Sequence, residues 1–515
     1  MSPVVAVVGG GISGLAAARV LAGGQPVAGH GRERPSGADP RELPNGRRDV
    51  EVVVLEGDER LGGKILSGQF RGRPVDFGPD NFLTRDPTAA ELCRQLGLGD
   101  DLAAPATSSA SVLARGRLRP LPAGLVLGIP TDLRALALSG IVSGPGIARA
   151  ALDLVGLGAP VRASSVGLGP DLRPGGGSGP RSTGSSGRDG PEWDAAAILQ
   201  RRLGREVVDR LVDPLLGGIN AGSTDQLSLA VVAPTVAKQL VGQRSVMHAL
   251  RALLPDQPAG RPGGGAASLF LGLRGGLGRL VEALVADLER RAVTLRTNAE
   301  VTVLRWDGGR YELETPSGTI AADGVVLATP GYSSARLLAD RLPRAAAELG
   351  SIPYAPVVLV TLCWRADSIS RLPSGSGFLV PRRERRLLTG CTVLSAKWPQ
   401  VAATGEVVIR ASTGRYGDER SSSMPDEELV GQVIGELREL IGVTEPPLAS
   451  VVRRWPRAFP QYLPGHLRKI EHAQAAMSEL PLLEIAGAAL GGIGIPACVT
   501  SGERAALAVL SRLSG

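Results

Sequence analysis

The chain opens with an apolar stretch, a group of glycines and a segment of helical composition. Val4 to Val8 are five consecutive apolar residues rich in β-branched side chains, which predicts a strand buried on both faces. Gly9, Gly11 and Gly14 follow with the spacing G-x-G-x-x-G, and Leu15 to Leu21 predicts a helix. We therefore expect the chain to begin with a strand, a glycine turn and a helix.

The three glycines of this turn have separate physical roles in a dinucleotide-binding site. Gly9 permits a tight turn, Gly11 lets the backbone approach a pyrophosphate, and Gly14 lets the helix pack closely on the strand. The N-terminus of the helix adds unpaired N–H groups and the positive end of the helix dipole, and both favour phosphate. A glycine-rich turn without a ligand would show the same spacing, so the motif needs a second half.

That second half is predicted at the next apolar stretch. Glu51 to Leu55 has the pattern of another buried strand, and Glu56 ends it with a carboxylate suited to a ribose diol. Such an acid usually stands about twenty residues after the glycines, and here the spacing is roughly double. We interpret the excess, residues 23–49, as a surface insertion, because it is rich in Gly, Pro, Arg and Asp.

The rest of the chain contains segments of both periodicities. Strands are expected at residues 293–305, 310–315, 319–328, 357–364, 406–412, 450–455 and 482–487, and helices at residues 86–96, 193–216, 277–289 and 426–441. Residues 118–157 are apolar with few charges, which fits a helical lobe or ordinary core helices. Residues 159–191 have almost no large apolar side chain, so we expect a disordered insertion there, and residues 255–267 predict a shorter loop of the same kind.

Further motifs give the chain a resemblance to a known family. Gly62, Gly63 and Lys64 form a Gly-Gly-Lys motif, and residues 72–78 contain Gly-x-x-x-Asp-x-Gly. Together with the glycine turn and Glu56, these motifs resemble the FAD signature of amine oxidases, phytoene desaturases and protoporphyrinogen oxidases. Asn81-Phe82-Leu83-Thr84-Arg85 narrows the resemblance to the porphyrinogen oxidases, which include the coproporphyrinogen III oxidases of Gram-positive bacteria. Similarity continues at residues 213–222, 273–277, 455–466 and 487–506, so it covers most of the chain outside the insertions.

The resemblance implies that FAD is the cofactor and that several distant segments hold it. The implied FAD-binding residues are Gly9, Gly10, Gly11, Ile12, Ser13, Gly14, Glu56, Gly62, Gly63, Lys64, Gly78, Pro79, Asp80, Val301, Gly487, Gly494, Ile495 and Pro496. The backbone near Val301 would lie against the adenine. Gly494, Ile495 and Pro496 open the last helix, whose N-terminus would face the flavin pyrimidine edge, where negative charge develops on reduction. Ala497 stands where relatives usually carry an acid.

The expected fold class is α/β, with a Rossmann-like FAD-binding domain, a discontinuous mixed α+β substrate domain and a helical lobe. The FAD-binding domain is expected at residues 1–85, 268–335 and 456–515, the lobe with a substrate-domain segment at residues 86–235, and the main substrate-binding domain at residues 336–455. Residues 217–222 are a glycine-rich loop that lies by the substrate in relatives, or else a simple turn. The charged residues 381–386 are expected to form a solvated turn.

Composition excludes several other classes of protein. The net charge of +7 is spread along the chain, so we do not expect a nucleic-acid partner, although an anionic substrate would be compatible with it. The four cysteines and four histidines are not clustered, so neither a disulfide framework nor a metal site is expected. No stretch is apolar enough to span a membrane. A cytoplasmic location is expected, compatible with peripheral contact with the inner face of the cell membrane.

The resemblance implies an FAD-dependent oxidation of coproporphyrinogen III to coproporphyrin III in haem biosynthesis, with O2 as acceptor, H2O2 released and a hand-over of product to ferrochelatase. Protoporphyrinogen IX is the alternative substrate. An amine oxidase or carotenoid desaturase would share the FAD signature but would not be expected to have residues 81–85 or Pro460-Gln461-Tyr462. A non-catalytic tetrapyrrole-binding flavoprotein is a third hypothesis. No histidine or carboxylate stands out as a general base, so no catalytic residue is predicted, and the sequence does not indicate an oligomeric state.

Overall fold

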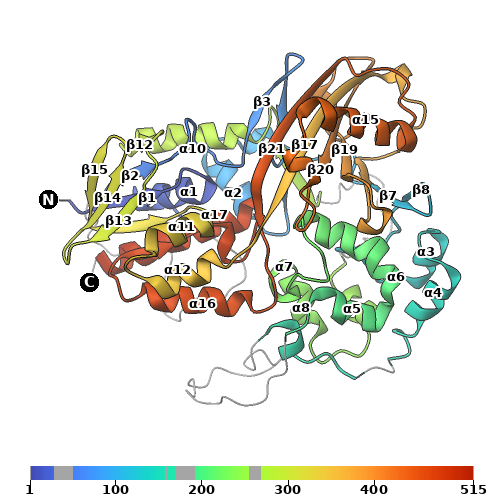
Figure 1. Ribbon diagram of the computed structural model, residues 1–515, viewed down its shortest axis with the longest axis horizontal. Coiled ribbons are helices and arrows are strands. Elements are labelled where there is room, and N and C mark those ends of the chain that lie inside the picture. The colour runs from blue at the N-terminus through green and yellow to red at the C-terminus, as the bar shows by residue number, and fades with distance from the viewer. Residues whose placement is uncertain (1, 28–49, 157–158, 169–191, 255–267, 514–515) are drawn as a thin grey trace. The chain divides into compact units, whose positions relative to one another are not determined.

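The computed structural model describes residues 2–27, 50–156, 159–168, 192–254 and 268–513 (Figure 1). It divides into two compact units, each assembled from separate stretches of the chain. Unit 1 comprises Met1–Pro105, Gly265–Pro353 and Arg468–Gly515, and unit 2 comprises Ala106–Gly264 and Tyr354–Leu467. The domain boundaries predicted from the sequence lay after residues 85, 335 and 455 and before residue 268. Of the surface insertion predicted at residues 23–49, residues 28–49 lie outside the described residues.

Unit 1 is built around a parallel five-stranded sheet with the strand order β12-β2-β1-β16-β22; Figure 1 labels β12, β2 and β1 of this sheet. Its strands are β1 (Val4–Val8), β2 (Glu51–Leu55), β12 (Thr294–Arg296), β16 (Gly324–Leu327) and β22 (Leu483–Ile485). The predicted strands at the start of the chain are therefore present. Because β1 is followed by β2 on one side and pairs with β16 on the other, the chain reverses direction across the sheet at β1, where open α/β sheets bind their ligands.

Three long helices cover one face of this sheet. They are α1 (Ile12–Leu21), α10 (Gly278–Arg290) and α17 (Ile495–Leu513), and α1 packs against both others. Alternate strand residues such as Val5, Val7 and Val54 share one apolar core with the leucines of α10 at positions 280, 284 and 288, all of which are fully buried. The side chains on one face of the strands, at every second position, thus pack against the leucines on one face of α10, at every fourth position.

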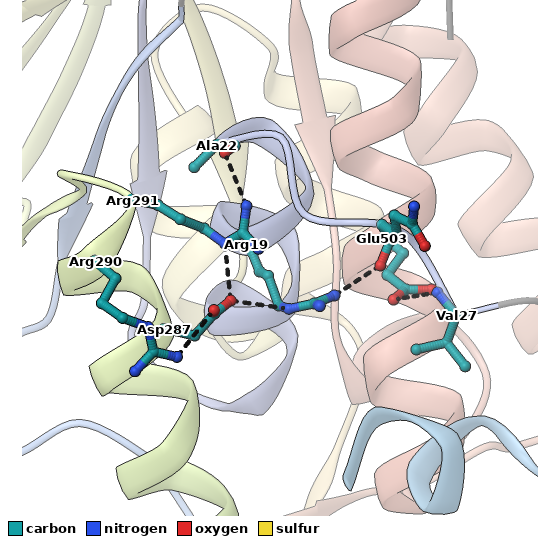
Figure 2. Close-up of polar contacts among 8 residues, drawn as sticks. Arg19, Ala22, Val27, Asp287, Arg290, Arg291 and Glu503 are labelled. Atoms are coloured by element: carbon teal, nitrogen blue, oxygen red, sulfur yellow. Dashed lines mark hydrogen bonds and ion pairs between the residues drawn. The ribbon is translucent and has the colours of Figure 1, made fainter. Parts of the chain in front are cut away.

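Figure 2 shows a polar network that ties α1 to α10. Arg19 of α1 is buried and pairs through Nε with Asp287 of α10 at 3.1 Å. Arg291 and Arg290 also pair with Asp287, at 2.8 and 3.2 Å. Burial by itself raises the pKa of Asp287, but the hydrogen bond and charge of Arg291, and the charge of Arg19, outweigh it and lower that pKa.

The remaining elements of unit 1 form smaller layers. They are β3 (Ser67–Phe70), β4 (Arg73–Asp76), β5 (Phe82–Leu83), α2 (Thr88–Gln95), β6 (Leu102–Ala103), β11 (Phe270–Leu273), β13 (Val303–Trp306), β14 (Tyr311–Thr315), β15 (Gly318–Ala322), α11 (Gly331–Leu338), α12 (Pro343–Gly350) and α16 (His466–Met477), the last of which begins in unit 2. The strands β13, β14 and β15 form an antiparallel meander.

Two segments expected as single strands are each divided between two sheets. Residues 293–305 supply β12 to the parallel sheet and β13 to the meander, and residues 319–328 supply β15 to the meander and β16 to the parallel sheet. Asn298 interrupts the first segment with a positive φ of 50°. Its N–H donates to Asp58 O, and the next N–H, of Ala299, donates to Glu56 O. The break therefore depends on contacts with a distant loop, which periodicity does not reveal.

Unit 2 contains a seven-stranded sheet with the order β21-β17-β20-β19-β18-β7-β8. The strands are β7 (Ser111–Ala114), β8 (Arg117–Pro120), β17 (Tyr354–Arg365), β18 (Gly377–Leu379), β19 (Leu388–Val393), β20 (Glu406–Thr413) and β21 (Ala449–Pro460). The predicted helix α15 (Asp426–Ile441) covers this sheet with four fully buried residues, Leu429, Val433, Leu437 and Ile441. Their spacing of four places them on one face of the helix.

A second core of unit 2 is largely helical. Its elements are β9 (Leu125–Val126), β10 (Ile129–Pro130), α3 (Leu133–Leu138), α4 (Gly144–Ala151), α5 (Ala195–Leu203), α6 (Arg205–Val207), a π-helix (Val208–Gly217), α7 (Leu229–Val232), α8 (Pro234–Leu240) and α9 (Val246–Arg251). Residues 159–168, expected to be disordered, are folded: Val161 bridges to Val241 and Val166 is fully buried. The remainder of that expected insertion, residues 169–191, and the expected loop at 255–267 lie outside the described residues.

Candidate cofactor site

The glycine turn joins β1 to α1 at the carboxyl end of the parallel sheet. Gly9 has a φ of 105°, which L-residues rarely adopt, and a Cβ on it would lie 2.8 Å from Ala328 O. A Cβ on Gly14 would lie 1.9 Å from Gly9 O, and a Cβ on Gly10 would lie 2.4 Å from a methyl group of Leu61. The packing of the protein itself therefore requires these three glycines.

Gly11 is different from its neighbours. It is the N-cap of α1, with an ordinary extended backbone (φ −72°, ψ 176°). Apart from its chain neighbours, a Cβ built on it would meet no atom of the described residues within 4 Å. The fold therefore leaves open space beside Gly11, next to the first N–H groups of α1, which no helix pairs internally. This is the space that a pyrophosphate needs, so the residues present fit the predicted cofactor.

Hydrogen bonds bring Glu56 and the Gly-Gly-Lys segment to this turn. One carboxylate oxygen of Glu56 accepts from the N–H of Gly10 at 2.6 Å, and the other accepts from the N–H of Asp58 at 2.9 Å. The N–H of Gly62 donates to Gly10 O at 2.8 Å. A Cβ on Gly63 would lie 3.2 Å from the Cα of Gly11. The separate motifs predicted from the sequence thus form one continuous backbone surface.

Arg60 holds the Gly-Gly-Lys segment in place, although the sequence analysis did not single it out. Its guanidinium donates to the carbonyl oxygens of Leu61, Gly63 and Ile65. The position of this arginine, two residues before Gly62-Gly63, could have indicated the role. A tight turn brings several backbone carbonyl oxygens close together, and a guanidinium has enough N–H groups to bond them all.

The Gly78–Asp80 segment packs directly behind Lys64. A Cβ on Gly78 would lie 2.1 Å from Lys64 O, and the buried side chain of Asp80 accepts from the amide of Asn81 at 3.2 Å. Asp76, within the same motif, serves the fold: its Oδ1 accepts the N–H of Leu277 at 2.9 Å, at the start of α10. The Gly-x-x-x-Asp-x-Gly pattern therefore combines a close backbone contact with a helix cap.

Val301 lies beside the Glu56 end of the site. The N–H of Ala299 donates to Glu56 O at 2.7 Å, which fixes the chain two residues before Val301. The Val301 side chain is buried, whereas its backbone N–H and C=O have no hydrogen-bond partner among the described residues. Those groups are available to a planar, hydrogen-bonding ligand such as adenine.

The last helix is connected to the turn through Ser13. A Cβ on Gly487 would lie 3.9 Å from Ser13 Oγ, and the N–H of Gly487 donates to Ser501 Oγ at 3.0 Å. Burial raises the pKa of the Cys498 thiol, and a hydrogen bond with Ser13 opposes that rise. Gly494 is exposed, whereas Ile495 and Pro496 behind it are buried, so the start of α17 presents its backbone rather than apolar side chains.

Lys64 combines two properties that are unusual together. Its side chain is exposed by solvent-accessible area, yet the protein around it lowers the pKa of its ammonium by desolvation, against the opposing effect of Cys498. A side chain that is uncovered but surrounded lines a concave surface, as expected of a residue at the edge of a ligand site.

Residues 12–510, nearly the whole chain, match the family described as flavin containing amine oxidoreductase. The chain belongs to this family. FAD is its cofactor, and the α/β fold with a Rossmann-like domain that the sequence predicted is confirmed.

Individual relatives place the chain more closely within the family. It is 33% identical to the coproporphyrinogen III oxidase of Propionibacterium freudenreichii subsp. freudenreichii, covering 97% of this chain and 89% of the relative. It is 31% identical to the coproporphyrinogen III oxidase of Bacillus subtilis (99% and 98%), and 28% identical to the chloroplastic protoporphyrinogen oxidase of Nicotiana tabacum (99% and 85%). The resemblance to porphyrinogen oxidases predicted from the motifs is confirmed.

Solved structures give the same fold. A crystal structure of a protein from Exiguobacterium sp. 255-15 superposes with a TM-score of 0.79 at 29% identity, covering 99% of both chains. Cyclohexylamine oxidase from Brevibacterium oxydans superposes with a TM-score of 0.62 at 16% identity, covering 100% of both chains, and this second likeness shows the fold alone.

In unit 2, residues 217–222 are held by several hydrogen-bond partners. Asn220 is buried, its O accepts from Gln461 Nε2 at 2.9 Å, and its amide donates to Leu216 O at 2.8 Å. The N–H of Tyr416 donates to Ala221 O at 2.8 Å. Gln461 belongs to Pro460-Gln461-Tyr462, one of the segments that resemble the porphyrinogen oxidases. In this structure its side chain holds the loop of residues 217–222 in place.

Proposed function

We propose that the protein is an FAD-dependent coproporphyrinogen III oxidase that forms coproporphyrin III in haem biosynthesis. The observation that carries the proposal is the similarity over almost the full length to proteins of that name, at 33% and 31% identity. It is supported by a glycine turn whose open side, at Gly11, suits the pyrophosphate of the cofactor.

The proposal assigns FAD to unit 1. The open backbone from Gly9 to Gly14 would hold the pyrophosphate, Glu56 the adenosine ribose and the free backbone groups of Val301 the adenine. Gly62, Gly63, Lys64 and Gly78–Asp80 would border the cofactor, and Gly487 with residues 494–496 would face the flavin. Bound FAD supplies the acceptor for hydride. Unit 2 is proposed to bind the tetrapyrrole.

The conversion of a porphyrinogen to a porphyrin removes six electrons and six protons, in three rounds of hydride and proton loss. In the proposed reaction each round consumes one O2 and releases one H2O2, which balances atoms and electrons. The task of the protein chain is therefore to bind and orient a flat tetracarboxylate and to hold the cofactor close to it. Conjugation of the product makes proton loss easier, so the reaction does not require a strong base.

The decisive experiment is turnover of two purified porphyrinogens, with and without O2. We expect porphyrin fluorescence to appear with coproporphyrinogen III, with O2 consumption and peroxide release, and with kcat/KM higher than for protoporphyrinogen IX. Binding of coproporphyrin III without turnover would refute the enzymatic proposal.

Protoporphyrinogen IX remains the second candidate because the tobacco protoporphyrinogen oxidase also matches along most of its length. A kcat/KM ratio that favours protoporphyrinogen IX by about tenfold, equivalent to about 1.4 kcal/mol, would select this alternative and leave the flavoenzyme assignment intact.

The location and partners belong to the same proposal. Among the helices of the described residues, none is long and apolar enough to span a bilayer. We infer a cytoplasmic enzyme that can contact the inner membrane face peripherally and pass its product to ferrochelatase. Co-sedimentation with anionic vesicles, and coproporphyrin transfer to ferrochelatase measured with and without a diluting excess of buffer, test these two points.

A further inference from the structure

Unit 2 contains two arginines without carboxylate partners beside residues 217–222. Arg415 is only 8% exposed, and its Nε has no hydrogen-bond partner among the residues that the structure describes. Arg382 is half-buried, its Nε also lacks a partner, and one of its terminal nitrogens makes only long bonds of 3.3 and 3.4 Å, to Gly222 O and Tyr416 O. In the described part of the chain, neither guanidinium forms an ion pair.

Nearby arginines behave differently. Arg420 makes two bonds of 2.8 Å to the carboxylate of Asp418, and Arg386 pairs with Glu439 at 2.8 Å. A paired arginine is the ordinary outcome, because an uncompensated buried charge is costly. The unpaired state of Arg382 and Arg415 therefore needs a reason.

Two carboxylates act on the charge of Arg415, but neither forms an ion pair with it among the described residues. Asp418 is occupied by Arg420, and Asp213 accepts from the N–H and hydroxyl of Thr224 at 2.8 and 3.0 Å. Burial lowers the pKa of Arg415, and the charge of Arg382 lowers it further, while Asp418 and Asp213 act in the opposite direction. The two guanidiniums are thus close enough to repel one another, and they remain charged because arginine loses its proton only far above neutral pH.

The backbone holds this arrangement rigidly. Arg415 lies in a tight turn closed by hydrogen bonds between Arg415 and Asp418 in both directions. The N–H of the adjacent Tyr416 is bonded to Ala221 O, and Arg382 reaches both Tyr416 and Gly222. In the loop that these contacts fix, Ile219 is 51% exposed and offers an apolar surface. A fixed pair of cations beside an apolar surface suits an anion attached to an apolar ring.

We propose that Arg382 and Arg415 form a carboxylate-binding pair that holds one propionate of the tetrapyrrole. This inference rests on the proposed function, which supplies a ligand with four propionates. The planar fork of a guanidinium matches a carboxylate in two parallel hydrogen bonds, and a second guanidinium can share the same two oxygens. The charged residues 381–386 are therefore not simply a solvated turn: Arg382 faces the protein, whereas Arg383 and Arg385 are exposed.

The test compares Arg415→Gln and Arg382→Gln with Arg385→Gln, which removes an exposed charge from the same turn. Dissociation constants are measured for coproporphyrin III and for its neutral tetramethyl ester, together with KM, kcat, flavin content and Tm. We expect Arg415→Gln to raise KM and the Kd of coproporphyrin III at least tenfold, with kcat within about twofold and flavin content unchanged. Ester binding should be the same in variant and wild type, and Arg385→Gln should change nothing.

A purely structural role for Arg415 predicts the opposite pattern. Because Arg415 forms no ion pair among the described residues, Arg415→Gln should change Tm little, so a clearly lower Tm, or misfolding of Arg415→Gln, would overturn the proposal. Unchanged Kd and KM in both variants, or equal loss of acid and ester binding, would also overturn it. Arg415→Lys keeps the charge without the fork and should restore affinity in part. If the wild type binds coproporphyrin III through this pair but forms no porphyrin from the porphyrinogen, the proposed function fails and the pair stands.

Discussion

Replacement of Gly11 by alanine tests whether the open space at the glycine turn belongs to the cofactor. The backbone of Gly11 has φ and ψ values that alanine adopts freely, and, apart from its chain neighbours, the added Cβ would meet no atom of the described residues within 4 Å. Restricting the unfolded chain favours alanine by about 0.4–1 kcal/mol. Loss of glycine at an N-cap costs a similar amount. The free energy of unfolding of the apoprotein should therefore change by less than about 1 kcal/mol.

FAD affinity should change much more. The Cβ would stand beside the first N–H groups of α1, where the pyrophosphate must approach to accept charge-assisted hydrogen bonds. Loss of one such bond is worth about 1.5–3 kcal/mol, which corresponds to roughly a 10- to 150-fold rise in Kd. Gly11→Val places two more methyl groups in the same space and should abolish stoichiometric FAD binding.

Gly14→Ala is the matched control, because it adds a methyl group to the same turn at a position where the group meets protein atoms and not open space. Its Cβ would lie 1.9 Å from Gly9 O, so the backbone must move, and both stability and FAD binding should fall together. The assays are flavin absorbance after purification, FAD titration of apoprotein and urea unfolding without cofactor. Stoichiometric FAD with wild-type affinity in Gly11→Ala and Gly11→Val would refute the placement of the pyrophosphate.

Two further predictions concern the stability of unit 1. Burial raises the pKa of Glu503 from 4.5 to about 7, and this effect outweighs the hydrogen bond from the N–H of Val27 and the charge of nearby Arg19, both of which lower that pKa (Figure 2). A raised carboxyl pKa favours the folded state at low pH, so the free energy of unfolding of the wild type should fall by about 3 kcal/mol between pH 4.5 and 7, at about 1.4 kcal/mol per pH unit. Glu503→Gln should remove that loss. A difference in stability between wild type and variant that is the same in melts at pH 5 and pH 8 would contradict this prediction. Asp76→Ala should cost about 1–2 kcal/mol through the lost cap at Leu277, with an unchanged urea m-value, and a wild-type midpoint would show that the cap contributes nothing.

Several elements were predictable because local patterns were strong. The strands β1 and β2 each contain four consecutive buried apolar residues, and α15 buries an apolar residue at every fourth position, namely Leu429, Val433, Leu437 and Ile441. The glycine turn and Glu56 were also found correctly as a spatial group, since in a parallel sheet the carboxyl ends of adjacent strands lie at one edge. Which residues contact FAD remains a prediction.

Other features depended on contacts between distant parts of the chain. Residues 159–168 are poor in large side chains, yet they fold because Val161 and Val166 find partners elsewhere in unit 2. Residues 293–305 divide into two strands because Glu56 O and Asp58 O accept the N–H groups in the middle. Neither set of partners can be predicted from the sequence of the segment itself, because the partners lie far away along the chain.

The sequence by itself determined the family, the cofactor and the order of the main elements, because each of these depends on short motifs and on periodicity. Only the tertiary structure decided what individual side chains do. Arg60 and Asp76 became supports of the site once the fold placed carbonyl or N–H groups beside them. Arg415 is one of many arginines in the sequence, and it is distinguished only by burial without a partner. Burial and pairing are set by what the rest of the chain places around a residue, so no local pattern can specify them.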